Sequence, residues 1–132
     1  MHAPITALWA GLLGILLLFL SGRVVNARNS EKILFGDGGS VVLLQHIRVH
    51  ANFVEYVPLG LLLLLVLELD GASPLVLNGL GGSLLVARLL HAFGLARSTG
   101  TSFGRFAGTV LTWLVLFAAS ALALYTYWGR AG

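Results

Sequence analysis

Four long apolar stretches dominate the sequence, and each has about the length that crosses a membrane as a helix. We expect these helices at about residues 5–25, 40–69, 74–93 and 103–128. Ser73 and Ser102 are expected to cap the starts of the third and fourth helices, and Gly94 the end of the third. Roughly 20 apolar residues cross about 30 Å of hydrocarbon, where a helix pairs its own backbone polar groups. The chain is therefore predicted to be an all-α membrane protein, a four-helix transmembrane bundle that forms one domain over residues 1–132.

The composition excludes several other classes of protein. Only 10% of the residues are charged and 58% are hydrophobic, whereas a soluble domain carries about 25% charged residues. This composition excludes a disordered chain, a coiled coil and an ordinary water-soluble enzyme. A net charge of only +3 argues against a nucleic-acid partner. The chain has no cysteine, so a reacting thiol would have to arrive on a substrate.

The short connections between the helices predict the orientation in the membrane. The first connection and the third lie on the same side, and most of the Arg and Lys residues gather there. The positive-inside rule places that side in the cytoplasm and both chain ends on the other side. Residues 36–39, Gly-Asp-Gly-Gly, are typical of a turn. No Gly-Lys-Ser/Thr follows them, so they do not predict a phosphate-binding loop.

A row of polar side chains enters the second apolar stretch and is the main functional candidate. When successive residues are placed about 100° apart around a helix, five polar residues fall on one face about 100° wide. They are Gln45, Arg48, Asn52, Glu55 and Tyr56. A charged side chain in the middle of a bilayer costs roughly 2.5 to 3.5 kcal/mol. The row is therefore expected to face protein, water or a ligand.

The residues alone leave two explanations of this row open. Arg48 and Glu55 stand two turns apart, about 10 Å along the axis, so they cannot simply neutralise each other within the helix. The half of the chain near the basic connections holds seven cations and three acids: Arg23, Arg28, Lys32, Arg48, Arg88, Arg97 and Arg105 against Glu31, Asp37 and Glu55. The surplus positive charge fits a structural network supplemented by lipid phosphates, and it equally fits a site for an anionic ligand.

Two histidines lie four residues apart on the helix face opposite Arg48. This spacing, between His46 and His50, is able to hold a metal ion. A third ligand is hard to find, because Glu55 points away from them. Packing or interfacial roles are therefore favoured, and no metal is expected.

The polar row matches a family motif. Residues 48–58, RVHANFVEYVP, resemble the second-helix motif of the MAPEG family, the membrane-associated proteins in eicosanoid and glutathione metabolism. That motif is R-x-x-x-N-x-x-E-[YN]-x-P, and every fixed position matches. Residues 25–28, at the end of the first span, and residues 87–91, at the end of the third, are also similar to family segments. The turn at residues 36–39 and the Arg-x-His-x-Asn variant resemble small bacterial members.

The resemblance implies an assembly, a ligand and a location. It implies a homotrimer in a bacterial inner membrane, with sites between neighbouring subunits near the cytoplasmic face. Glutathione would be the co-substrate, and a lipophilic second substrate would enter from the surrounding lipids. The activity implied is that of a transferase or a peroxidase, in which the glutathione thiolate attacks an electrophile or reduces a lipid peroxide.

The resemblance also implies roles for individual residues. The four motif residues that would hold the γ-glutamyl end of glutathione are Arg48, Asn52, Glu55 and Tyr56. Arg28 would approach the glycine carboxylate, and Arg105 would lie near the sulfur as the catalytic residue. Arg88 and His91 would be further contacts to glutathione. The family often has two tyrosines at the end of the third helix, where this chain has His91 and Leu95.

Two readings from other functional classes compete with an enzyme. One is a non-catalytic lipid-binding or scaffold protein of the same fold, whose lipid binding would not depend on Arg105. The other is a small transporter with Glu55 on its ion path. The transporter is the least favoured, because residues 57–67 of the same helix are apolar and offer no polar path.

Overall fold

A computed structural model describes residues 2–96 and 102–131 of the chain. Four helices account for almost all of these residues: α1 (Pro4–Glu31), α2 (Val41–Leu69), α3 (Pro74–Ala96) and α4 (Phe103–Ala131). All four are long and apolar enough to cross a membrane. The predicted all-α fold with four membrane-spanning helices is therefore confirmed.

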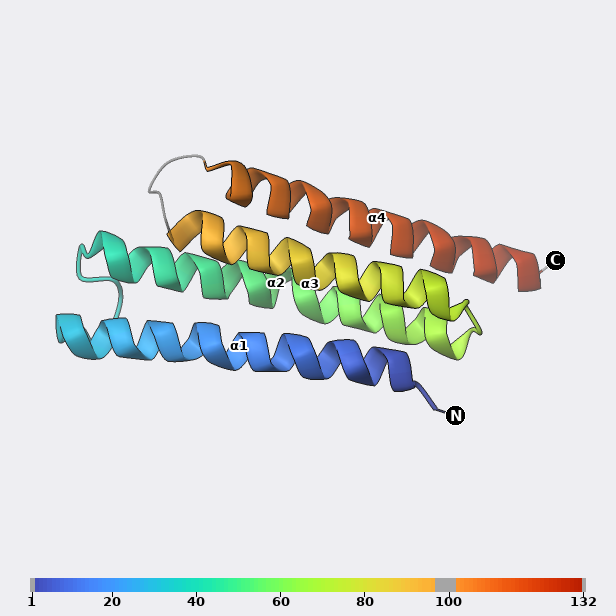
Figure 1. Ribbon diagram of the computed structural model, residues 1–132, viewed down its shortest axis with the longest axis horizontal. Helices are drawn as coiled ribbons and strands as arrows, with labels where there is room; N and C mark the ends of the chain where they lie inside the picture. The colour runs from blue at the N-terminus through green and yellow to red at the C-terminus, as the bar shows by residue number, and fades with distance from the viewer. Residues whose placement is uncertain (1, 97–101, 132) are drawn as a thin grey trace.

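The helices run alternately up and down and are not all in mutual contact. Figure 1 shows α2 and α3 in the middle, with α1 and α4 on the outside. Within the described residues, α1 packs on α2 and α3, and α4 packs on α3 and α2, but α1 and α4 do not meet. Both chain ends lie at the end of the bundle where α2 turns into α3 (Figure 1). We call the opposite end, where α1 turns into α2 and α3 is followed by α4, the basic end.

Three helices begin where the sequence places a serine cap. Ser40 accepts a hydrogen bond from the Leu43 amide at 3.2 Å. Ser73 and Ser102 accept corresponding bonds at the starts of α3 and α4, from Val76 at 3.4 Å and from Arg105 at 3.3 Å. These contacts satisfy amides that have no partner within the helix. The predicted caps Ser73 and Ser102 are confirmed.

The end of α3 differs from the prediction. Gly94 was expected to cap the helix, but α3 continues to Ala96, so that prediction was wrong. A Cβ atom on Gly94 would stand 2.4 Å from the backbone nitrogen of Arg105 and 2.7 Å from the carbonyl carbon of Gly104. The missing side chain therefore allows the backbones of α3 and α4 to approach each other at the basic end.

Helix α1 extends six residues beyond the expected end at residue 25, to Glu31. Lys32 then adopts a left-handed conformation with φ of 55°, and its amide bonds back to the carbonyls of Arg28 and Asn29. This geometry is a common helix ending. Hydropathy marks the part of a helix that lies in hydrocarbon, so it missed this polar last portion.

The end of the bundle opposite the basic end is held by contacts between helices. Glu68, near the end of α2, accepts hydrogen bonds from the first free amides of α1, Ile5 at 2.9 Å and Thr6 at 2.6 Å. A carboxylate at this position also complements the positive end of the helix dipole. Trp9 on α1 donates to Asn78 on α3 at 3.2 Å. The Glu68 carboxylate of α2 thus fixes where α1 begins.

Candidate functional site

The polar row on α2 divides into an outer part and an inner part. Arg48 and Glu55 are exposed on the outer surface of the bundle. Neither forms an ion pair or hydrogen bond within the described residues. Asn52 and Tyr56 are half-buried and turn toward α3 and α4, where they find partners. The described part of the chain therefore does not form the internal ion-pair network that was one explanation of the row.

Among the described residues, Arg88 of α3 is the largest fully enclosed side chain, with 2% of its surface exposed. Its Nη1 atom donates to Oδ1 of Asn52 at 2.7 Å. Its Nη2 atom donates to the carbonyl oxygen of Gly108 at 3.2 Å and to the hydroxyl of Thr112. Its Nε atom has no hydrogen-bond partner among the described residues. The guanidinium thus connects α2, α3 and α4 through neutral acceptors.

Tyr56 is contacted by two side chains. The Arg88 guanidinium carbon lies 5.7 Å from the centre of its ring, within the range of a cation–π interaction. In addition, Nε1 of Trp113 in α4 donates to the Tyr56 hydroxyl at 3.2 Å. The positions of Asn52 and Tyr56 are therefore both set by side chains from α3 and α4.

His91 lies one turn after Arg88 and is buried, with 6% of its surface exposed. A Cβ atom on Gly108 would stand 2.6 Å from the His91 backbone nitrogen and 2.6 Å from the Ala87 carbonyl oxygen. The glycine therefore brings α4 directly against the turn of α3 that carries Arg88 and His91. The predicted roles of both residues as glutathione contacts stay predictions.

The other two predicted arginines lie at the basic end. Arg28 donates through Nη1 to the carbonyl oxygen of Gly36 at 2.8 Å, and a longer contact reaches Ile33 at 3.5 Å. The side chain thus folds over the connection between α1 and α2. Arg105 is exposed in the first turn of α4. Arg97, counted among the cations of this half, lies outside the described residues. The structure does not bring Arg28 or Arg105 into contact with Arg48.

The two histidines on the opposite face of α2 lie toward α1. The ring Nε2 of His50 is 3.0 Å from the Ser21 hydroxyl, and that hydroxyl donates to the Leu17 carbonyl at 2.9 Å. His50 therefore acts as the donor to Ser21 and helps to join α1 to α2. Across residues 2–96 and 102–131, no three His, Cys, Asp or Glu residues gather as a possible metal site.

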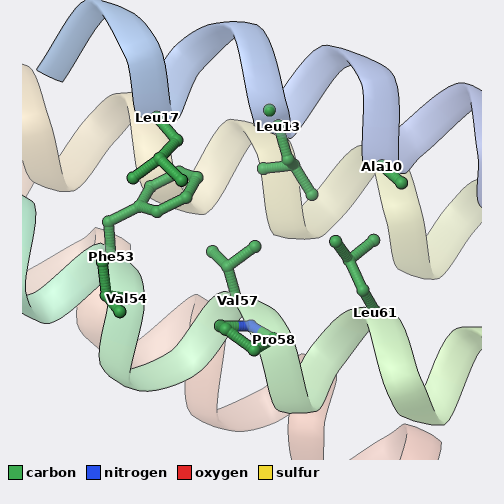
Figure 2. Close-up of a pocket in the computed structure, with 9 residues that line it drawn as sticks. Ala10, Leu13, Leu17, Phe53, Val54, Val57, Pro58 and Leu61 are labelled. Atoms are coloured by element: carbon green, nitrogen blue, oxygen red, sulfur yellow. The ribbon is translucent and has the colours of Figure 1, made fainter. Parts of the chain in front are cut away.

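An apolar cavity of about 220 Å³ opens between α1 and α2, near the middle of the bundle. Figure 2 shows Leu13 and Leu17 of α1 facing Phe53, Val57 and Leu61 of α2 across it. Pro58 also lines it; this residue lacks the amide that would continue the helical hydrogen bonding. The cavity offers the kind of surface that an acyl chain or another lipophilic molecule contacts.

The sequence did not identify three residues that support the site. Gly108, Thr112 and Trp113 lie in an apolar helix and belong to no motif that we recognised. Gly108 and Thr112 are four residues apart, which places them on one face of α4, and Trp113 follows Thr112 directly. Only the packing of α4 on α3 shows that this face meets Arg88.

Comparison with known proteins agrees with the resemblance seen in the motif. The model of the MAPEG family matches residues 6–125. The inner membrane protein YecN of Escherichia coli strain K12 is 39% identical over 90 residues, which cover 68% of this chain and 69% of that protein. YecN of Escherichia coli O6:H1 matches to the same extent. The chain is thus an integral, multi-pass membrane protein, and it belongs to the MAPEG family.

Proposed function

We propose that the protein is a glutathione-dependent membrane enzyme, a transferase or a peroxidase acting on lipophilic substrates. The MAPEG family includes glutathione transferases and peroxidases. The observation that carries the proposal is the outer face of α2. There a cation, Arg48, and an acid, Glu55, lie on the same helix face as Asn52 and Tyr56, and neither charge has a partner among the described residues.

Glutathione complements these groups because it carries two carboxylates and one ammonium. A guanidinium pairs with a carboxylate through two parallel hydrogen bonds, which suits Arg48. Glu55 suits the ammonium of the γ-glutamyl end. Arg28 would meet the glycine carboxylate after leaving the carbonyls that it now contacts. Binding of glutathione would thus give partners to both Arg48 and Glu55, which lie too far apart on α2 to pair with each other.

We propose that a second copy of the chain covers this face, and that three copies form a homotrimer. Charged side chains facing lipid are costly, and Arg48 and Glu55 face outward from their own subunit. Among the described residues, α1 and α4 also make no contact with each other. Packing between copies would enclose the site and exclude lipid from it.

The proposed chemistry needs a thiolate and a route for the second substrate. A guanidinium near the sulfur stabilises the thiolate over the thiol, and Arg105 is the proposed source of that charge. In the transferase reaction, the sulfur forms a bond to an electrophilic carbon while the bond to the leaving group breaks. The lipophilic substrate would reach the site sideways from the bilayer.

The test compares binding with turnover in the Arg105→Ala variant. We expect glutathione to bind Arg105→Ala about as tightly as it binds the unchanged protein. Conjugation of a lipophilic aryl chloride or reduction of a lipid hydroperoxide should fall at least tenfold. Arg23→Ala, which removes a charge elsewhere at the basic end, serves as the control and should keep full turnover. Equal turnover in both variants would contradict the role of Arg105.

A non-catalytic lipid-binding protein is the second candidate, and the cavity between α1 and α2 favours it. Such a protein would retain lipids through purification and would bind them independently of Arg105. Replacing Gly14, which lines the cavity, by Leu would then displace a copurifying lipid. Full glutathione turnover in Gly14→Leu, with no lipid detected by mass spectrometry in the unchanged protein, would exclude this candidate.

A further inference from the structure

The contact between Arg88 and Asn52 fixes which way the Asn52 amide points. A guanidinium has only donors, so the atom that it meets at 2.7 Å must be the carbonyl oxygen of the amide. The amide nitrogen therefore points away from Arg88. That NH₂ group has no partner within the described residues and is not buried. Asn52 thus has two N–H donors available to a ligand, while its carbonyl oxygen accepts from Arg88.

The same reasoning applies to Tyr56. An indole N–H can only donate, so the Tyr56 oxygen is the acceptor of the 3.2 Å bond from Trp113. The phenolic hydrogen is then available to donate to another acceptor. Tyr56 forms no other hydrogen bond within the described residues. Like Asn52, it is left with a donor to offer.

Arg88 is itself held in place from α4. The Thr112 hydroxyl donates to the Gly108 carbonyl of its own helix at 2.7 Å, which leaves its lone pairs to accept from Arg88. The Gly108 carbonyl accepts from Arg88 as well. Each of these bonds therefore has a defined donor and a defined acceptor. The guanidinium therefore cannot turn away from Asn52 without losing two bonds to α4.

We infer that Arg88 and Trp113 are positioning residues that set the hydrogen-bond polarity of the site, which means that they determine which of its groups donate to a ligand and which accept from it. They make Asn52 and Tyr56 donors toward a ligand, so that together with Arg48 these residues select a carboxylate. Glu55 is left as the acceptor for an ammonium. The inference rests on the proposed function and deepens it: the α-carboxylate of the γ-glutamyl group is the part of the ligand that these donors recognise.

The sharpest test is Asn52→Asp, which changes the polarity while keeping the shape. One carboxylate oxygen would pair with Arg88, giving this buried cation an opposite charge, so thermal stability should be equal to or above that of the unchanged protein. The other oxygen would replace the outward donor with an acceptor. We expect glutathione affinity to fall at least tenfold. Asn29→Asp, which adds the same charge at an exposed position of α1, should bind glutathione normally.

A second test removes one of the positioning contacts without touching the core. Trp113 has 56% of its surface exposed, so Trp113→Phe should fold. The ligands are glutathione and its decarboxy analogue, in which γ-aminobutyrate replaces the γ-glutamyl group. Trp113→Phe should weaken glutathione binding about fivefold and leave binding of the analogue unchanged. A merely structural defect would weaken both ligands equally. Trp128→Phe, another exposed indole on α4, should change neither.

The outcomes separate this inference from the proposed function. If the unchanged protein binds no glutathione, the proposed function fails and this inference fails with it. If the protein binds glutathione and Asn52→Asp binds it equally well, only the polarity inference is overturned. The same conclusion follows if Trp113→Phe weakens the binding of glutathione and of its decarboxy analogue by the same factor.

Discussion

Gly108→Ala should loosen the contact between α3 and α4 that supports Arg88. The added Cβ would stand 2.6 Å from the Ala87 carbonyl oxygen and 2.6 Å from the His91 nitrogen. Both atoms belong to the backbone, so neither moves without its helix. Ordinary contact begins at about 3.4 Å, and the helices must therefore separate locally by about 0.8 Å.

The energetic cost follows from two opposing effects. Overpacking of this kind costs about 1 to 3 kcal/mol, and a backbone obstacle favours the upper part of that range. Replacing glycine by alanine within a helix stabilises the helix by roughly 1 kcal/mol, because alanine has the higher helix propensity. We therefore expect Gly108→Ala to lower the free energy of unfolding by about 1 to 2 kcal/mol. It should also weaken glutathione binding, because Arg88 loses its bonds to α4.

The measurement is an SDS unfolding titration of the detergent-solubilised protein, with Gly79→Ala as the matched control. A Cβ on Gly79, also within a membrane-spanning helix, meets nothing within 4 Å. That variant should keep or raise the free energy of unfolding. If Gly108→Ala were as stable as Gly79→Ala, the inference that α3 and α4 approach each other closely at Arg88 would be contradicted.

Two further predictions concern the ends of the bundle. Glu68→Ala should lower the free energy of unfolding by about 2 kcal/mol, because it removes two amide contacts and a favourable helix-dipole interaction. The same SDS titration measures this loss, and Glu31→Ala, at an exposed position, should show almost none. Arg28→Ala should speed amide hydrogen exchange in residues 33–39, since Arg28 bonds to two carbonyls of that connection. Unchanged exchange there would show that Arg28 does not hold the connection.

Much of the fold could be predicted because its causes are local. Apolar length gave the four spans, and Ser73 and Ser102 act within one turn of the residues that they cap. The end of α1 at Glu31 was missed because a polar helix beyond the hydrocarbon has no hydropathy signal. Gly94 was misjudged because a glycine near a helix end also suits a close crossing, and the sequence does not show which helix passes there.

The sequence predicted which residues belong to the candidate site, but not how their side chains are arranged. Helical spacing placed Arg48 and Asn52 on one face of α2. It gave no information on how far α3 and α4 cover that face, so the division into an exposed cation and a half-buried amide emerged only from the fold. Arg88 and Thr112 are 24 residues apart, and no local rule connects residues at that distance.

Binding of glutathione to the outer face of α2 is the central claim, and calorimetric titration tests it most directly. Glutathione would be titrated into the purified protein in detergent, with Arg48→Ala measured alongside. We predict saturable binding to the unchanged protein and at least a tenfold loss of affinity in Arg48→Ala, because a charge-assisted pair is removed. No binding at millimolar glutathione, in protein shown to be folded and oligomeric, would contradict the account.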